Sequence, residues 1–305
     1  MAEWLLEHGI GETRAALAES GAILEARIER HGTLARYGAV LPAKLRSKAG
    51  RAGRAEAELE DGSLALVSPA TVAEGATLLV EIIREAIPER GNPKLPLARP
   101  AEGPARPPQL LEGTAVPPYG PDLLEAAGWS ELLNQAETGL VPFSGGLLRI
   151  ELTSAMTVID IDGDLPPGEL AKRGAAAAGA AIRRLGIAGS IGIDLPTLPD
   201  KAARQAAAEA LDLALPPPFE RTAVNGFGFL QVVRRRVRPS LLELIQSDPV
   251  TAQAVALLRQ LEREPLPGPE QVEAPAAVAR LLTERVDWLE DLAKRRGRRV
   301  AIVPA

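Results

Sequence analysis

Hydrophobic and polar positions alternate over the first third of the chain, in short segments separated by small turns. Residues 1–92 contain several such runs, including YGAVLPAKLRS, AEAELEDGSLALVS and ATLLVEIIREA. Alternation with a period of two is typical of strands that are buried on one face. The pattern predicts a β-rich region over 1–92 with little helix, organised as a small β-barrel.

Proline dominates the next segment, residues 93–121, which contains nine prolines together with several glycines. Proline has no backbone donor for a helix or a sheet ladder, and proline-rich stretches behave as extended spacers. We therefore expect a linker over 93–121 that contributes no core.

Helical and strand periods alternate after this linker. LLEAAGWSELLNQAE has the spacing of an amphipathic helix, and GLLRIEL and MTVIDID are β-type runs joined by a short turn, which predicts a hairpin. PPGELAKRGAAAAGAAIRRLG begins with proline and ends with glycine, as many helices do. SIGIDLP and DKAARQAAAEALDLAL then predict a strand and a second helix. Residues 157–213 therefore form a β-α-β unit followed by a helix.

Three carboxylates lie at the ends of the two strands in this unit: Asp160, Asp162 and Asp194. The carboxyl ends of parallel strands meet at one edge of the sheet, where open α/β sheets bind ligands. Neighbouring carboxylates repel one another unless a cation offsets their charge, and oxygen ligands of this kind suit Mg²⁺. The strand ends thus indicate a magnesium site. The alternative is that these acids cap the following helices or lie in hydrated loops.

Composition excludes several kinds of chemistry. The chain of 305 residues has no cysteine and two histidines, so disulfides, thiolate zinc sites and cysteine nucleophiles are excluded. It contains no apolar run long enough to span a membrane, and its first residues are acidic rather than a basic leader. With 46% hydrophobic and 25% charged residues it should fold as a globular protein. We expect a cytoplasmic protein without a membrane partner.

Basic residues are concentrated in a few tracts, although the net charge is −5. Clustered cations can neutralise phosphates, and the alternative is a solvated surface. The candidate phosphate contacts in two of these tracts are Lys44, Arg46, Lys48, Arg234, Arg235, Arg236 and Arg238.

Several segments resemble the ribonuclease E/G family. FSGGLLRIELTSAMTVIDID is similar to its motif of a Ser-Gly-Gly turn, a strand, a Thr-containing turn and a strand ending in Ile-Asp-(Ile/Val)-Asn. AGSIGIDL resembles the family's next strand, FGFLQVVRRRVRPSL its Phe-Gly and arginine-rich segment, and REAIPERGNPKLPLA the end of its S1 domain. The tail from ALLRQLER onward is similar to its small C-terminal domain. The resemblance covers most of the chain in the family's order.

This resemblance implies a fold of mixed α+β and α/β class. The expected parts are an S1-like (OB) β-barrel within 1–92, a DNase I-like/RNase H-like nuclease domain over 122–247 and a small C-terminal α/β domain over 248–305. The implied activity is that of a Mg²⁺-dependent endoribonuclease acting on single-stranded RNA, with Mn²⁺ as a possible substitute. A non-catalytic RNA-binding or scaffold relative is the alternative.

The resemblance also implies roles for individual residues. Asp160 and Asp194 correspond to the carboxylates that hold Mg²⁺, which would activate water for attack on a phosphodiester, and the arginines between 234 and 238 would contact the RNA backbone. Asp162, also assigned to the catalytic site, stands where the family has Asn.

Other features depart from the family. Its zinc link needs cysteines, so we expect no zinc, and either a monomer or a zinc-independent dimer. The interval 99–144 is too short for the family's sensor of a 5′-monophosphate, so cleavage should begin directly at internal sites. AEAELEDGSLALV in the barrel region lacks the aromatic residues that stack on bases.

Overall fold

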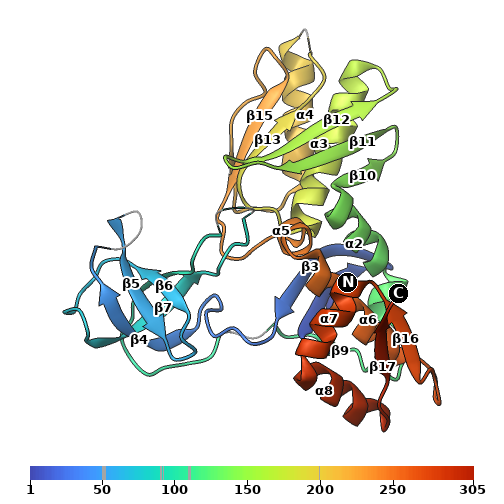
Figure 1. Cartoon of the computed structure of the whole chain (residues 1–305). Helices are drawn as coiled ribbons and strands as arrows, with labels where there is room; N and C mark the ends of the chain where they lie inside the picture. Colours follow the sequence, from blue (N-terminus) through green and yellow to red (C-terminus); the bar gives the residue numbers. More distant parts are fainter. Residues whose placement is uncertain (50–52, 90, 92, 109–110, 199) are drawn as a thin grey trace. The chain divides into compact units, whose positions relative to one another are not determined.

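The computed structural model describes residues 1–49, 53–89, 91, 93–108, 111–198 and 200–305. It is a mixed α+β structure with a closed five-stranded barrel and, in the described part of the chain, eight helices (Figure 1). Contacts divide it into two compact units. Unit 1 comprises Met1–His31, Glu112–Thr138 and Leu244–Ala305, and unit 2 comprises Gly32–Leu111 and Gly139–Glu243. Each unit is assembled from segments that are separate in sequence, unlike the consecutive domains predicted from the sequence.

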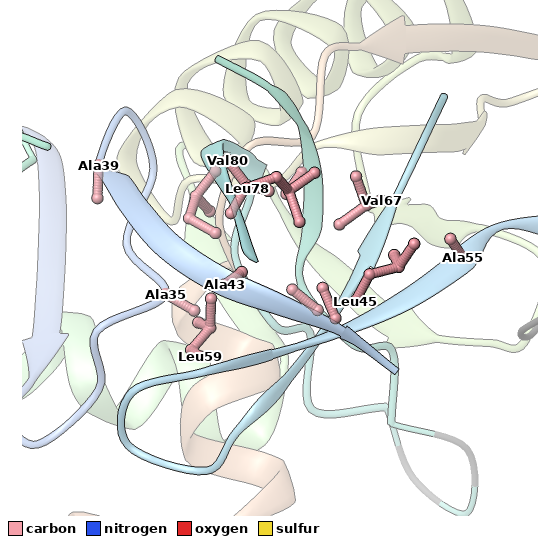
Figure 2. Close-up of a cluster of buried hydrophobic side chains, with 13 residues drawn as sticks. Ala35, Ala39, Ala43, Leu45, Ala55, Leu59, Val67, Leu78 and Val80 are labelled. Carbon is pink, nitrogen blue, oxygen red and sulfur yellow. The ribbon is translucent and has the colours of Figure 1, made fainter. Parts of the chain in front are cut away.

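The barrel belongs to unit 2 and closes in the order β4-β5-β6-β8-β7. Its strands are β4 (Val40–Ser47), β5 (Ala55–Leu59), β6 (Leu64–Val67), β7 (Thr77–Arg84) and β8 (Leu97–Pro100). Alternate residues point inward and form an apolar core in which alanines such as Ala43 and Ala55 lie beside larger side chains such as Leu45 and Val80 (Figure 2). The alternation in the sequence thus correctly indicated a barrel.

The predicted linker was wrong in one respect, and the predicted β-rich region over 1–92 divides into two parts. Strand β8 lies within the expected linker, pairs with both β6 and β7 and buries Ala98 in the barrel core. The first 31 residues do not belong to the barrel but to unit 1. A closed barrel must pair both edges of its sheet. Strand β8, in the proline-rich segment, provides this pairing, and local composition does not reveal it.

The second part of unit 2 is a six-stranded sheet with the order β10-β11-β12-β13-β15-β14. Its strands are β10 (Leu140–Phe143), β11 (Gly146–Leu152), β12 (Thr157–Gly163), β13 (Gly189–Asp194), β14 (Glu220–Arg221) and β15 (Phe229–Arg234). The predicted hairpin is the antiparallel pair β11–β12. The predicted β-α-β unit is confirmed, since β12 and β13 are parallel neighbours on either side of α3 (Pro167–Arg184) in the chain.

Helix α3 packs against one face of this sheet and against α4 (Lys201–Ala214). Ile159 and Ile161 of β12 are buried, and a Cβ on Gly174 of α3 would overlap Ile161, so the glycine allows the helix to approach closely. Side chains at alternate positions point to opposite faces of a strand. Asp160 and Asp162 therefore lie on the face that α3 leaves uncovered.

Unit 1 contains a four-stranded sheet with the order β3-β2-β1-β9. Its strands are β1 (Glu3–His8), β2 (Glu12–Glu19), β3 (Ala22–Arg30) and β9 (Thr114–Ala115), the last of which is parallel to β1. The single helix predicted after the linker is divided into α1 (Leu123–Ala126) and α2 (Trp129–Thr138). Gly128, between them, has a φ of 96°, which ends the first helix.

The C-terminal residues also contribute to unit 1. They form α6 (Pro249–Arg263), β16 (Gln271–Ala274), α7 (Ala276–Glu284), α8 (Val286–Arg296) and β17 (Ala301–Pro304), after α5 (Leu241–Ser247). Strands β16 and β17 form a parallel pair. The core between α6, α7 and α8 includes Ile10, between β1 and β2. The predicted domain over 248–305 therefore shares its core with the N-terminal strands.

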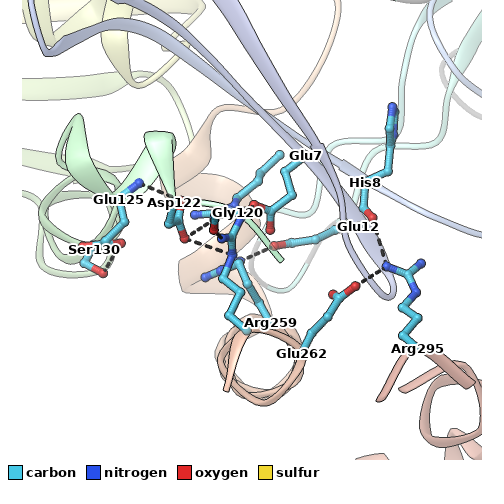
Figure 3. A network of polar contacts seen from close by, with 12 residues as sticks. Glu7, His8, Glu12, Gly120, Asp122, Glu125, Ser130, Arg259, Glu262 and Arg295 are labelled. Atoms are coloured by element: carbon cyan, nitrogen blue, oxygen red, sulfur yellow. Dashed lines mark hydrogen bonds and ion pairs between the residues drawn. The ribbon is translucent and has the colours of Figure 1, made fainter. Parts of the chain in front are cut away.

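A buried network of ion pairs connects the segments of unit 1 (Figure 3). Arg14, with 1% of its side chain exposed, donates to Glu7 at 2.8 Å and to Asp122 at 2.6 Å. Arg263 of α6 contacts the same two carboxylates, and Arg259 donates to Glu12 at 3.0 Å. Buried charges of this kind persist only when they are paired. The network fixes β1, β2, α6 and the start of α1 against one another.

No helix within the described residues is both long and apolar enough to cross a membrane.

Candidate active site

The parallel pairing of β12 and β13 brings the predicted carboxylates together. Asp160 lies directly opposite Asp194 in the register of the two strands, and Asp162 lies two residues beyond Asp160 on the same face. Adjacent strands are about 4.8 Å apart, so the carboxylates of Asp160 and Asp194 are within reach of one cation. These three acids lie at one edge of the sheet, as the strand pattern of the sequence predicted.

The electrostatics of this edge favour a cation. Burial, followed by the negative charges of Asp162 and Asp194, raises the pKa of Asp160 above its ordinary value. Among the residues that the structure describes, no group of three or more His, Asp or Glu side chains could hold a metal ion, so Asp160, Asp162 and Asp194 do not together form a three-carboxylate ligand set. Mg²⁺ commonly takes only one or two carboxylates and completes its shell with water and substrate oxygens. The pair Asp160–Asp194 fits that pattern.

Arg149 of β11 partly balances the third carboxylate. Its Nε donates to Oδ2 of Asp162 at 3.0 Å, and the two side chains are 50% and 57% exposed. Arg149 is paired with Asp160 in the strand register, so its guanidinium reaches diagonally along the sheet to Asp162. Arg149 was not among the residues predicted from the sequence. The register of the predicted hairpin, which places residue 149 opposite residue 160, was the signal that could have found it.

A glycine turn packs against the end of β12. Gly145 has a φ of 98°, and a Cβ on Gly146 would overlap the carbonyl oxygen of Asp162. Arg173 of α3 donates to the hydroxyl of Ser144 at 3.3 Å. The Ser-Gly-Gly sequence therefore allows the β10–β11 turn to lie close to the backbone that carries the aspartates.

The four candidate arginines at and after the end of β15 have different environments. Arg234 donates to the carbonyl of Ile187 at 3.0 Å, and Arg236 bridges Glu89, at 2.9 Å, and Glu243. Arg235 and Arg238 lie 5.9 and 6.0 Å from the ring of Tyr37. Arg234 and Arg236 thus hold parts of unit 2 together, and Arg235, whose side chain is exposed, is better placed to meet a phosphate.

The three candidate cations of the barrel lie on β4 or directly after it. Lys44 and Arg46 are exposed on this strand, where they alternate with buried Ala43 and Leu45, and Lys48 is exposed just after it. Arg46 forms an ion pair with Glu58 on the neighbouring strand β5. These residues form a basic strip on the outside of the barrel.

No family model matches the chain, and no curated protein matches it.

Proposed function

We propose that this protein is a Mg²⁺-dependent endoribonuclease that hydrolyses phosphodiester bonds in single-stranded RNA. The observation that carries the proposal is the register of Asp160 and Asp194 at the carboxyl ends of two parallel strands, on the uncovered face of the sheet. The order of the Ser-Gly-Gly turn, the hairpin and the two strand ends also resembles the ribonuclease E/G family. This resemblance supplies RNA as the substrate.

Each group of candidate residues would have a separate role in the reaction. Asp160 and Asp194 would hold Mg²⁺, or Mn²⁺, and Arg149 would hold Asp162 aside from the ion. A bound Mg²⁺ supplies a water of lowered pKa and neutralises charge on the phosphate. The water oxygen would form a new bond to phosphorus and give up its proton to solvent, while the bond from phosphorus to the leaving ribose oxygen would break and that oxygen would take up a proton from solvent. Arg235 and the basic strip of β4 would contact backbone phosphates.

The alternative is a non-catalytic RNA-binding or scaffold protein. It is favoured by the negative charge of Asp162, which stands close to where a phosphate would approach, and by the engagement of Arg234 and Arg236 with other parts of unit 2. An endoribonuclease and an RNA-binding relative both bind single-stranded RNA and differ in whether a bond is broken, whereas a scaffold need not bind RNA.

Cleavage of an end-labelled, unstructured RNA tests the proposal. Internal cleavage is expected with Mg²⁺ or Mn²⁺ and should stop when a chelator is added. A zinc-selective chelator should change neither the rate nor the mass of the protein in solution. RNA bound without cleavage would support the RNA-binding alternative, and the absence of both binding and cleavage would contradict the endoribonuclease and the RNA-binding role and favour the scaffold.

A further prediction concerns Asp162 and Arg149. Asp162→Asn should retain or increase cleavage, because it removes a charge that would repel the phosphate. Arg149→Ala should reduce cleavage by at most about fivefold, since exposed ion pairs contribute about 1 kcal/mol or less. The double variant should resemble Asp162→Asn, because Arg149 then has no carboxylate to balance. Rates measured across a Mg²⁺ titration check this cycle, and complete loss in Asp162→Asn would show that Asp162 is itself an essential ligand.

A further inference from the structure

An exposed aromatic side chain lies in the turn before β15, two residues from the position opposite Asp194. The chain has three Trp, two Tyr and four Phe residues, all of them in the described part of the chain, and of these only Tyr119 and Phe227 are exposed, at 92% and 85%. Trp129 and Trp288 belong to the interior of unit 1. Phe227 belongs to unit 2 and lies two residues before the start of β15, the strand that pairs with β13.

The turn that carries Phe227 is rigidly hydrogen-bonded. The side-chain oxygen Oδ1 of Asn225 accepts from the backbone nitrogens of Phe227, at 2.9 Å, and Phe229, at 3.1 Å. The backbone nitrogen of Asn225 donates to the carbonyl of Phe229 at 2.9 Å, and that of Gly228 donates to the carbonyl of Asn225 at 3.2 Å. These bonds determine the direction of the backbone at Phe227, so its exposed ring is presented from a defined position.

The same turn is attached to the segment that follows Asp194. The backbone nitrogen of Leu195 donates to the carbonyl of Gly228 at 3.1 Å. Gly228 has a φ of 90°, and a Cβ there would overlap the carbonyl oxygen of Leu195. Phe229 lies opposite Asp194 in the antiparallel register of β13 and β15. Phe227 is therefore two residues from the position that faces a proposed metal ligand.

The neighbouring sheet surface is also aromatic. A Cβ on Gly192 would overlap the ring of Phe229 and approach the sulfur of Met156, so the glycine allows this ring to lie across β13. Gly192 is paired with Val158 on β12, two residues before Asp160. A nucleotide whose phosphate lies at the aspartates would thus meet an apolar surface on the β15 side of the site.

Single exposed apolar residues are common on protein surfaces. Phe227 differs from such residues because a network of backbone and side-chain bonds fixes its turn next to candidate ligands for a metal ion. Aromatic rings bind single-stranded nucleic acid by stacking on its bases, and this stacking tolerates any sequence. The five described barrel strands contain no aromatic residue that could stack on a base. Tyr37 lies before β4, and its ring is near Arg235 and Arg238.

We propose that Phe227 stacks on a nucleobase of the single-stranded RNA next to the scissile phosphate, with Asn225 and Gly228 as positioning residues for its turn. This inference rests on the proposed function for the choice of RNA as ligand. It assigns base contact to the nuclease sheet rather than to the barrel.

The test measures RNA binding separately from cleavage. The full-length protein is titrated into a fluorescent 12-nucleotide single-stranded RNA in the presence of a chelator, so that the RNA stays intact. Phe227→Ala should weaken binding about tenfold or more, in line with stacking measured by alanine substitution elsewhere. Phe227→Trp should retain binding, and RNA should quench its additional fluorescence relative to the parent protein. Tyr119→Ala, which removes the other exposed aromatic ring, is the matched control and should bind like the parent.

An oligonucleotide that lacks all bases provides the decisive comparison, because Phe227→Ala and the parent should bind it equally. Equal binding of normal RNA by Phe227→Ala and the parent would overturn the stacking role even if the protein cleaves RNA. An equal loss on normal and base-free RNA would overturn it too, because it would indicate a general loss of binding. A selective loss on normal RNA in a protein that does not cleave would support stacking and refute only the nuclease activity.

Discussion

Asp160→Asn and Asp194→Asn are each expected to reduce Mg²⁺-dependent cleavage of single-stranded RNA by about 100-fold or more. Each substitution replaces one of the two carboxylates that face each other across β12 and β13 with a neutral amide. The remaining single carboxylate would bind Mg²⁺ weakly, because it supplies only one charged ligand. Initial rates on one labelled RNA, measured across a Mg²⁺ titration, check this expectation.

The same variants should not be less stable than the parent protein when metal is absent. The raised pKa of Asp160 means that its carboxyl binds a proton more tightly in the folded than in the unfolded chain. The free energy of unfolding therefore falls as the pH rises from about 4, the ordinary value of an aspartate, through the raised folded value. Asparagine at this position removes that loss, so the melting temperature of Asp160→Asn at pH 7 in chelator should equal or exceed that of the parent.

Asp164→Asn is the matched control for both measurements. Asp164 is exposed in the turn after β12 and lies two residues beyond Asp162. Its replacement should leave the cleavage rate and the melting temperature nearly unchanged. Parent-like cleavage by either Asp160→Asn or Asp194→Asn would contradict the proposed metal site. A large loss in the control would indicate that general surface charge, rather than this pair, controls the rate.

Local periodicity was sufficient to predict the sheet that carries the site. The hairpin, α3, β13 and α4 each follow from patterns within about twenty residues, and their order dictates parallel pairing of β12 with β13. The meeting of Asp160 and Asp194 is a consequence of that topology. This meeting could be predicted because each aspartate belongs to the same short segment that predicts its strand.

Long-range pairing explains what the sequence pattern did not reveal. Strand β8 completes the barrel from within a proline-rich segment, and β9 joins β1 across more than a hundred residues of sequence. A two-residue strand such as β9 has no periodicity to detect. Membership in these sheets depends on which edges remain unpaired elsewhere, which is a property of the folded chain.

The sequence was sufficient to predict that the aspartates of the candidate site lie together, but not which other side chains lie around them. Arg149 reaches Asp162 because β11 is antiparallel to β12 in one particular register, and the turn that carries the exposed Phe227 is closed by hydrogen bonds to Asn225. Arg234 and Arg236 were grouped with Arg235 because they adjoin it in sequence. The end of β15 directs each of them to a different environment.

We expect the largest effect on stability from a substitution in the buried ion pairs of unit 1. Glu7→Gln is expected to lower the free energy of unfolding by about 3 kcal/mol, because removing one partner from a buried ion pair leaves an uncompensated charge. Glu7 is 2% exposed and accepts from both Arg14 and Arg263. Burial, followed by the charge of Arg14, already lowers the pKa of Arg259. The loss of Glu7 would therefore add a net positive charge to surroundings that disfavour it.

Urea denaturation of Glu7→Gln beside Glu25→Gln provides the comparison. Glu25 pairs with Arg27 on β3 in the same unit, but the two side chains are 27% and 29% exposed. Partly solvated pairs contribute about 1 kcal/mol or less, so the control should shift the midpoint only slightly while the slope of each transition stays constant. Equal, small shifts in both variants would show that Asp122 alone satisfies Arg14 and Arg263. A large shift confined to Glu7→Gln would show that the segments of unit 1 depend on the shared carboxylate of Glu7, since hydrophobic contacts of α6 remain in both variants.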